Sequence, residues 1–268
     1  PGLSSVYTVE VDGSDPAFRA TDDKEIKGIF DFGVLEEVPG DPPKGANIVQ
    51  GRMRRIYKEP NEQRPKSRLV AQGFGDSRQL IDIASPTPSK ISVRWFFCLC
   101  ATLRKRVEDF DVKQAFLQGA ELEGPPVYFK IKKDRYLSAE LCKKVFRLRK
   151  SLYGLSDASR QWCDHIFSLL KKCGWVPSKN DPCLWFYWGG PDGRTLIGCL
   201  ILYIDDGIFF AEGSAKASIE KLATMVVFGN RNSSGKWRFL GIDGWQNKDF
   251  SITLDNSEYA KAITEKFS

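Results

Sequence analysis

Two apolar runs separated by a pair of aspartates constrain the fold of this chain more than any other feature. Residues 196–204 and 207–211 are almost wholly apolar, and only Asp205 and Asp206 lie between them. Two such runs around two turn-forming residues are typical of a β-hairpin with buried strands. Aspartate also favours tight turns, so the pair alone does not distinguish a simple turn from a functional site. The sequence predicts a hairpin with two carboxylates at its tip.

The rest of the pattern predicts helices and strands that alternate without a regular β-α-β repeat. Periodicity and breakers indicate helices within 24–39 and over 92–104, 156–175 and 214–228, and strands over 51–58, 107–112, 235–241 and 250–254. Prolines make the stretch 82–90 an expected extended loop. This order predicts an α+β fold built on an antiparallel sheet.

Composition restricts the chemistry to carboxylates. His165 is the only histidine, which argues against His-based catalysis and His-rich metal sites. The seven cysteines are scattered and form no C-x-x-C pair, so we expect a reducing intracellular compartment. No apolar run reaches the roughly 18 residues of a membrane span, so no membrane partner is expected. The compartment stays open between cytoplasm, nucleus and, because the sequence begins with Pro1 instead of Met, an organelle after removal of a targeting peptide.

Asp111 supplies a third carboxylate in a similar setting, within the apolar strand predicted over 107–112. Carboxylates held close together repel one another unless a cation neutralises them, and oxygen-rich sites suit Mg²⁺. Three strand-borne carboxylates without histidine fit two-metal phosphoryl transfer. We therefore expect Asp111 to lie on a strand next to Asp205 and Asp206, with two Mg²⁺ ions bound by the three side chains.

Positive charge is concentrated in one part of the chain. The net charge is +6, and residues 130–150 hold nine basic side chains against only Asp134 and Glu140. Such a block fits a polyanionic partner such as RNA or an RNA/DNA hybrid, and a solvated basic face explains it equally well. The side chains of the block that we expect to contact phosphate are Lys143, Lys144, Arg147, Arg149 and Lys150.

An ordered series of motifs resembles the copia-type reverse transcriptases of LTR retrotransposons. The motifs are KSRLVAQGF (66–74), ASPTPSK (84–90), FDVKQAFLQG (110–119), VYFKI (127–131), FRLRKSLYGL (146–155), ASRQW (158–162), DPCLW (181–185) and LYIDDGIFF (202–210). One tetrapeptide would be weak evidence, whereas eight motifs in the family's order are specific.

The resemblance implies a right-hand polymerase fold over residues 24–262. Its fingers subdomain would precede and interrupt a palm whose antiparallel, ferredoxin-like sheet has helices on one face. Residues 1–23 would then be a polar N-terminal arm. Residues 263–268 would be the start of a thumb, and neither the rest of a thumb nor an RNase H portion is expected in this chain.

The resemblance also assigns roles around the reaction centre. Asp111 matches the first catalytic aspartate of the family, and Asp205 and Asp206 match the pair in its Y-x-D-D box. Phe116 matches the aromatic steric gate under the sugar, where a ring would collide with a 2′-hydroxyl and so select deoxynucleotides. A core phenylalanine is the alternative at this position. Arg68 resembles the fingers arginine that grips the incoming triphosphate.

Further candidates would contact the nucleotide or the nucleic acid. Lys58 and Lys66 are additional candidates for the triphosphate, although surface lysines are more often only solvated. The segment containing Phe239 and Gly241 matches the hairpin that positions the primer end, and an apolar strand end in the core is the alternative.

Three departures from the family pattern keep two functions open. Asp157 and Ser159 stand where Gln and Pro are usual, which puts an anion near a phosphate backbone, and Gly207 is expected to loosen the strand behind the carboxylates. The first hypothesis is an RNA-directed DNA polymerase using deoxynucleotides, favoured by the intact aspartates. The second, favoured by the missing thumb, is a domesticated, non-catalytic RNA-binding or scaffold component bound to proteins of a ribonucleoprotein such as an organellar ribosome.

Overall fold

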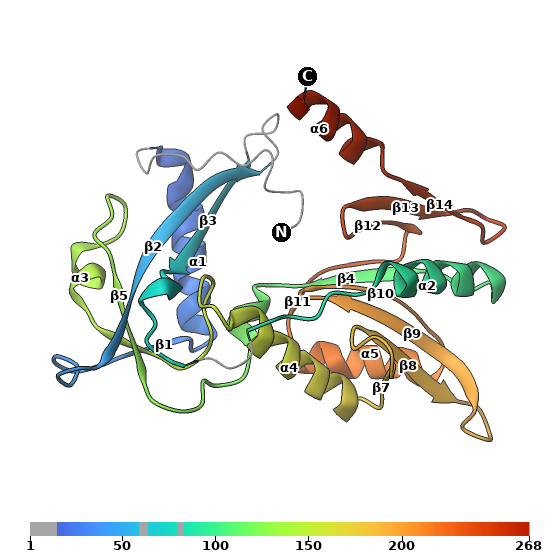
Figure 1. Cartoon of the computed structure of the whole chain (residues 1–268), viewed down its shortest axis with the longest axis horizontal. Coiled ribbons are helices and arrows are strands. Elements are labelled where there is room, and N and C mark those ends of the chain that lie inside the picture. The colour runs from blue at the N-terminus through green and yellow to red at the C-terminus, as the bar shows by residue number, and fades with distance from the viewer. Residues whose placement is uncertain (1–14, 59–63, 80–82, 268) are drawn as a thin grey trace. The chain divides into compact units, whose positions relative to one another are not determined.

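The chain forms two compact units, which a computed structural model describes over residues 15–58, 64–79 and 83–267 (Figure 1). Unit 1 contains Ser85–Ala115 and the chain from Cys163 onward. Unit 2 contains the described residues up to Ala84 together with Phe116–Trp162. Each unit has its own cluster of buried apolar side chains. No helix in the described ranges is long and apolar enough to cross a membrane.

Unit 1 is built on a six-stranded antiparallel sheet with the order β11-β4-β10-β9-β8-β7. Its strands are β4 (Glu108–Val112), β7 (Val176–Pro177), β8 (Leu184–Gly189), β9 (Thr195–Tyr203), β10 (Asp206–Ala211) and β11 (Phe228–Asn232). With α4 (Ala158–Lys172) and α5 (Ser214–Met225), the order β4-α4-β9-β10-α5-β11 is that of a ferredoxin-like β-α-β-β-α-β unit, as expected.

Helices pack on both faces of this sheet. Phe167 of α4 packs its ring on Trp185, and a Cβ at Gly198 of β9 would collide with Ala215 of α5. The opposite face buries Cys199, Ile201, Ile208 and Phe210 in one cluster with α2 (Lys90–Thr102). The two helices of the ferredoxin-like unit thus share a face, as expected. A further helix, α2, which is not part of that unit, covers the other face.

A small three-stranded sheet completes unit 1. It consists of β12 (Lys236–Phe239), β13 (Ile242–Gln246) and β14 (Ile252–Asp255), followed by α6 (Ser257–Phe267). Trp237 stacks on Phe97 of α2 with ring centroids 5.6 Å apart. The Gln246 side chain accepts from Val107 N–H at 3.2 Å and donates to Lys105 C=O at 2.9 Å. These contacts anchor the small sheet to α2 and to the segment that enters β4.

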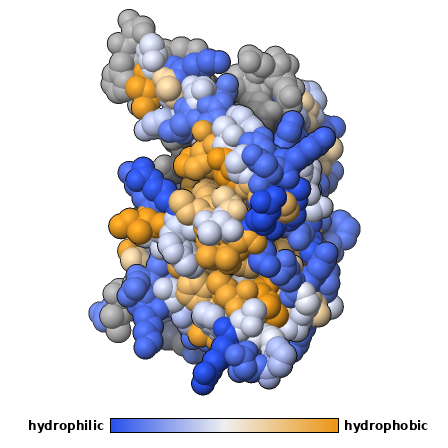
Figure 2. Space-filling model, turned by 90° about the vertical axis from the view of Figure 1, so that its right-hand side faces the viewer, coloured by the Kyte–Doolittle hydropathy of each residue, from blue (hydrophilic) through white to orange (hydrophobic). Residues whose placement is uncertain are grey.

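Apolar side chains also reach the surface of unit 1. Ile91 and Trp95, one turn apart on α2, are exposed, and the Trp95 ring packs edge-on against Phe186, which lies next to the exposed Trp188. Figure 2, which looks at the right-hand side of Figure 1, shows apolar patches among polar side chains on that face.

Unit 2 contains a five-stranded sheet with the order β1-β6-β5-β2-β3, in which only β2 and β5 run parallel. Its elements are η2 (Pro16–Phe18), α1 (Arg19–Asp31), β1 (Leu35–Glu37), β2 (Asn47–Lys58), β3 (Arg64–Ala71), η3 (Gly73–Gly75), η4 (Ala115–Gln118), β5 (Val127–Ile131), α3 (Ala139–Lys143) and β6 (Phe146–Leu148). Residues 1–14 of the expected N-terminal arm lie outside the described residues. The described part of that arm is helical, because Asp15 caps η2 by accepting from Ala17 N–H at 2.9 Å and α1 follows at once.

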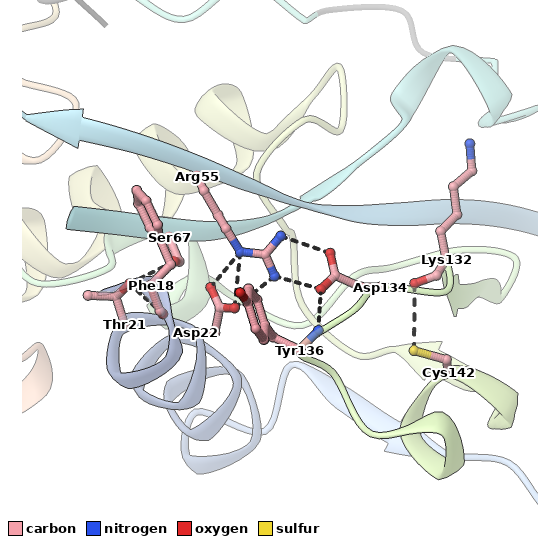
Figure 3. A network of polar contacts seen from close by, with 9 residues as sticks. All are labelled: Phe18, Thr21, Asp22, Arg55, Ser67, Lys132, Asp134, Tyr136 and Cys142. Atoms are coloured by element: carbon pink, nitrogen blue, oxygen red, sulfur yellow. Dashed lines mark hydrogen bonds and ion pairs between the residues drawn. The ribbon is translucent and has the colours of Figure 1, made fainter. Parts of the chain in front are cut away.

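A buried arginine links three parts of unit 2 (Figure 3). Arg55 of β2 has a side chain only 3% exposed, and its Nη2 lies 2.7 Å from Asp22 of α1 and 2.7 Å from Asp134, which follows β5. Asp134 also accepts from Tyr136 N–H at 3.0 Å. Burial alone would lower the pKa of Arg55, but hydrogen bonds to both carboxylates raise it. The guanidinium therefore stays charged and holds α1, β2 and the segment after β5 together.

Replacing this arginine tests its contribution. We expect Arg55→Met to lower the free energy of unfolding by about 3–5 kcal/mol in urea titrations, because it leaves carboxylates without their cation in a buried site. Lys133→Met, an exposed change beside Asp134, should alter it by less than about 0.5 kcal/mol. Equal effects of the two variants would contradict a structural role for Arg55.

The network also predicts a pH dependence. Burial alone would raise the pKa of Asp134, but hydrogen bonds from Arg55 hold it below its usual value. The stabilisation is therefore present above the unfolded-state pKa of about 4 and is lost as the pH falls through the lowered folded-state value. In Arg55→Met this part of the acid-induced loss should disappear.

Candidate active site

The strand register of unit 1 brings two of the three predicted aspartates together. β10 pairs with β4 antiparallel, and Asp206 lies directly opposite Asp111. Directly opposed residues of an antiparallel pair have side chains on the same face, with Cβ atoms roughly 5 Å apart. Asp109, two residues before Asp111, shares that face because side chains alternate along a strand. The expectation that Asp111 lies on a strand next to the aspartate pair is confirmed.

The third aspartate lies in the turn. Ile204 and Asp205 connect β9 to β10, and Tyr203 pairs with Asp206 to close the hairpin. Ile204 has a φ of +55°, which is rare for a β-branched residue and marks the first central position of a type II′-like turn. Val112 N–H donates to Asp205 C=O at 2.8 Å, which fastens the turn to β4 beside Asp111. Strained backbone held by its surroundings is frequent at functional sites.

The three predicted carboxylates do not form one group of metal ligands in the described part of the chain. Within the described residues, no three His, Cys, Asp or Glu side chains lie close enough together to hold one metal ion. Asp111 and Asp206 are aligned by strand pairing, whereas Asp205 precedes β10 and the register does not align its side chain with theirs. Two carboxylates on one face do fit oxygen-ligand chemistry of the kind Mg²⁺ prefers. The metal-ligand roles of Asp111, Asp205 and Asp206 stay predictions.

Two neighbours shape the environment of Asp111. Burial raises the pKa of Asp109 to about 6; a hydrogen bond from Asn232 opposes this rise, and the charge of Asp111 adds to it. Gly229 of β11 lies so close that a Cβ there would collide with the Asp111 carboxylate. Negative charge is thus concentrated on this face, and only glycine leaves room for the carboxylate at that point. Sequence reasoning missed Asp109 and Gly229, although Asp109 lies in the same strand as Asp111.

Gly207 has a different role from the one expected. It lies directly opposite Phe110 in the β4–β10 pair, and a Cβ at Gly207 would collide with the Phe110 ring. Phe110 is buried and stacks on Phe228 with ring centroids 4.5 Å apart. The glycine therefore does not loosen the strand; it lets an aromatic ring pack behind the carboxylates.

Asp157 also requires a correction. It was expected to place an anion near a phosphate backbone, but the carboxylate is buried and one of its oxygens lies 3.0 Å from Nη2 of Arg78. The partner is distant in the sequence, so the pairing was not visible there. The charge of Asp157 is compensated inside unit 2.

The nucleotide candidates of unit 2 meet at a residue that the sequence reasoning did not single out. The Arg68 guanidinium lies over the ring of Tyr153 at 4.8 Å, and Phe116 packs edge-on against that ring at 5.2 Å. Phe116 is also packed against the core of unit 2, so its position is compatible with both of its proposed roles. Tyr153 stands in the motif FRLRKSLYGL, which was the available signal.

The other two nucleotide candidates are less defined. Lys66 lies two residues before Arg68 on β3, so the two side chains leave the same face of the sheet. Lys58 is the last residue of β2, and its side chain lies outside the described residues.

Part of the basic block is neutralised by distant acids. Lys144 lies 2.9 Å from Glu37, and Arg149 lies 2.7 Å from Glu121. Hydrogen bonds to these carboxylates raise the pKa of both side chains. The other three candidates of the block, Lys143, Arg147 and Lys150, have no acidic partner within the ranges that the structure describes. The five expected phosphate-binding side chains therefore fall into two groups. Two are paired with acidic side chains, and three are available cations, meaning that they have no such partner in the described ranges.

The predicted primer-positioning hairpin is present, but its two residues differ. Phe239 pairs with Ile242, and the turn between them has positive φ at Leu240 and Gly241. The Phe239 ring is buried in the core cluster of unit 1, in agreement with the alternative of an apolar strand end. Gly241, at the tip, stays a candidate for contact with nucleic acid.

Comparison with known sequences identifies the family. The profile of the family described as "Reverse transcriptase (RNA-dependent DNA polymerase)" matches residues 41–268. The chain belongs to this family. The resemblance to copia-type enzymes is confirmed. The assignment of unit 2 to the fingers and of unit 1 to the palm stays a prediction.

Individual relatives agree with this assignment. The Retrovirus-related Pol polyprotein from transposon TNT 1-94 of Nicotiana tabacum is 35% identical over 76% of the chain, and that from transposon RE2 of Arabidopsis thaliana is 31% identical over 62%. The matches span only 15% and 11% of those polyproteins. A foamy viral protease-reverse transcriptase solved with ds DNA is similar over 98% of this chain and 40% of its own, with a TM-score of 0.47 and 11% identity, too weak a likeness to build on.

Substitution of Gly207 distinguishes the two roles considered for it. If the glycine only weakened the strand, Gly207→Ala would stabilise unit 1 by about 0.5–1 kcal/mol. Because a Cβ would meet the Phe110 ring, we expect destabilisation by about 1–3 kcal/mol in urea unfolding. Gly75→Ala, at an open position with nothing within 4 Å of the added Cβ, is the matched control and should change little. Stabilisation by Gly207→Ala would contradict the packing role.

Proposed function

We propose that this chain is the fingers-and-palm part of an RNA-directed DNA polymerase that adds deoxynucleotides to a primer on an RNA template or RNA/DNA hybrid. The observation that carries the proposal is the register that sets Asp206 opposite Asp111 on one face of a ferredoxin-like palm sheet. Membership of the reverse transcriptase family, which generally uses divalent metal ions, supports the same chemistry.

The reaction centre would consist of Asp111, Asp205 and Asp206 holding two Mg²⁺ ions. When bound, the ions supply activation of the primer 3′-hydroxyl and charge stabilisation of the triphosphate and the leaving pyrophosphate. Asp111 and Asp206 offer oxygens on a shared face, and the turn at Ile204 holds Asp205 next to β4.

The fingers would bind the nucleotide. The Arg68 guanidinium lies against the Tyr153 ring, which orients a planar fork of donors suited to phosphate oxygens. Phe116, edge-on to the same tyrosine, would act as the gate under the sugar. Lys66, on the same face of β3 as Arg68, and Lys58 are further candidates for the triphosphate.

A second candidate function is that of a domesticated, non-catalytic RNA-binding or scaffold component of a ribonucleoprotein such as an organellar ribosome. One observation favours it: the Asp205 side chain does not join Asp111 and Asp206 in a three-ligand group within the described part of the chain. In that case the folded core and the basic surface would carry the function and the aspartates would not be used.

Removal of two aspartates separates these functions. We expect the double substitution Asp205→Asn/Asp206→Asn to abolish Mg²⁺-dependent primer extension, because it removes charge stabilisation of the transition state. Fold and nucleic-acid affinity should be retained, since the change also relieves repulsion between neighbouring anions. Asp41→Asn, an exposed carboxylate in the fingers, should leave extension unchanged.

The wild-type chain gives the decisive comparison. If it shows no extension at any Mg²⁺ concentration while assembling into a ribonucleoprotein particle as well as the double variant does, the scaffold function is supported and the polymerase is not.

A salt series tests the basic block. We expect removal of the available cations, in Lys143→Gln/Arg147→Gln/Lys150→Gln, to weaken RNA and DNA binding. The slope of log affinity against log salt should fall by up to about 2–3, because each phosphate contact contributes roughly 0.7–0.9. The matched variant Lys144→Gln/Arg149→Gln should change the slope less, since acidic neighbours already offset those charges. An unchanged slope in the triple variant would exclude this surface as the phosphate-binding face.

A further inference from the structure

Phe74 stands out among the apolar side chains of the fingers. It is 90% exposed, more than any other large apolar residue in the described ranges. It lies in η3, three residues after the end of β3. Single exposed apolar residues are common and need no function. What distinguishes Phe74 is how firmly its backbone is held.

A contact between backbones fixes the start of this segment. A Cβ at Gly73 would collide with the carbonyl of Gly154, and a Cβ at Gly154 would collide with that of Ala71. Ala71 N–H donates to Tyr153 C=O at 2.6 Å, and Gln72 N–H donates to Gln50 C=O at 2.7 Å. Only glycine allows the two backbone segments to approach so closely. The segment before Phe74 therefore packs directly against residues 153–154.

Charged groups fix the end of the segment. Arg78 binds Asp76 at 2.7 Å and Asp157 at 3.0 Å, and all three side chains are largely buried. Asn47 donates from Nδ2 to Asp76 at 2.8 Å and accepts from Ser77 N–H at 3.1 Å. Burial alone would lower the pKa of Arg78, but its carboxylate partners raise it, so the cation is retained. The loop is therefore anchored on both sides of Phe74, and the aromatic ring is presented to solvent by rigid backbone.

We propose that Phe74 is a stacking platform for an unpaired base of single-stranded RNA or DNA. This rests on the proposed function and assigns a fingers residue to the nucleic-acid strand. An exposed ring on rigid backbone offers a flat apolar surface at little entropic cost, and base–aromatic stacking is the usual way to hold single strands without reading sequence.

The surroundings favour nucleic acid over a protein partner. The strand that leads to Phe74, β3, and its neighbour β2 carry basic side chains on the face opposite the core. These side chains are Arg52 and Arg54 of β2 and Lys66 and Arg68 of β3. Tyr153, whose carbonyl holds Ala71, has its ring against Arg68, the candidate for the triphosphate. The platform is thus joined by direct contacts to the proposed nucleotide-binding residues of the same unit, where a strand with unpaired bases is expected.

The test uses the full chain with single-stranded oligonucleotides that contain 2-aminopurine, whose fluorescence falls when it stacks. Phe74→Leu keeps an apolar side chain but removes the ring, and Phe74→Trp keeps a ring. We expect Phe74→Leu to weaken single-strand binding by about 5- to 100-fold, with loss of the fluorescence change and an unchanged salt slope. Phe74→Trp should bind as the wild type does. Blunt duplex binding should be the same for all three proteins.

Controls keep the outcomes distinct. Ile91→Ala, at an exposed apolar residue of the palm, should leave single-strand binding unchanged. If Phe74→Leu binds single strands and lowers 2-aminopurine fluorescence as the wild type does, Phe74 is not a stacking platform. The chain would still bind nucleic acid, and Phe74 would instead be a contact for a protein. If Phe74→Trp is as weak as Phe74→Leu, stacking is excluded. If the wild type binds no single strand even at low salt, the proposed function fails together with this inference.

Discussion

The pairing of β4 with β10 is the constraint on which the rest of unit 1 depends. Phe110 fills the space that Gly207 leaves open, and this packing holds one register between the two strands. A shift by one residue would place the Phe110 ring against a side chain and turn Asp111 to the other face of the sheet. The same register then sets Asp206 opposite Asp111 and allows Val112 to bind the carbonyl of Asp205. The candidate reaction centre is thus a consequence of apolar packing on the reverse side of the sheet.

Unit 2 is organised by polar contacts as much as by its apolar core. Arg55 joins α1 to β2 and to the segment after β5, and Arg78 joins the loop after β3 to the chain before α4. Buried charges of this kind add little net stability compared with apolar contacts, but they penalise any arrangement that separates them. Both arginines therefore select one placement of segments that carry candidate functional side chains. The glycine contact between residues 73 and 154 restricts the same segments by shape.

Much of the fold and part of the site were predictable from the sequence. The hairpin at Asp205–Asp206 and the strand around Asp111 follow from contiguous apolar runs, and the structure has both. The start of α1, the second helix-covered face, the packing role of Gly207 and the pairing of Asp157 were not predicted. Except for the start of α1, which follows the local Asp15 cap, each depends on a partner elsewhere in the chain; Arg78 and Asp157, for example, are 79 residues apart. The buried Phe239 shows the same limit, because a strand-end aromatic has the same local pattern in a core and at a surface.

By itself, the sequence determined the family, the ferredoxin-like order of elements and the candidate carboxylates, because these depend on local periodicity and on motifs whose residues are neighbours along the chain. Only the tertiary structure decided which charges are compensated and which side chains face one another. It divided the basic block into paired and available cations, brought Tyr153 between Arg68 and Phe116, and aligned Asp206 but not Asp205 with Asp111. Electrostatic compensation and side-chain contact depend on distance in space, which strand register and packing set and which sequence spacing does not contain.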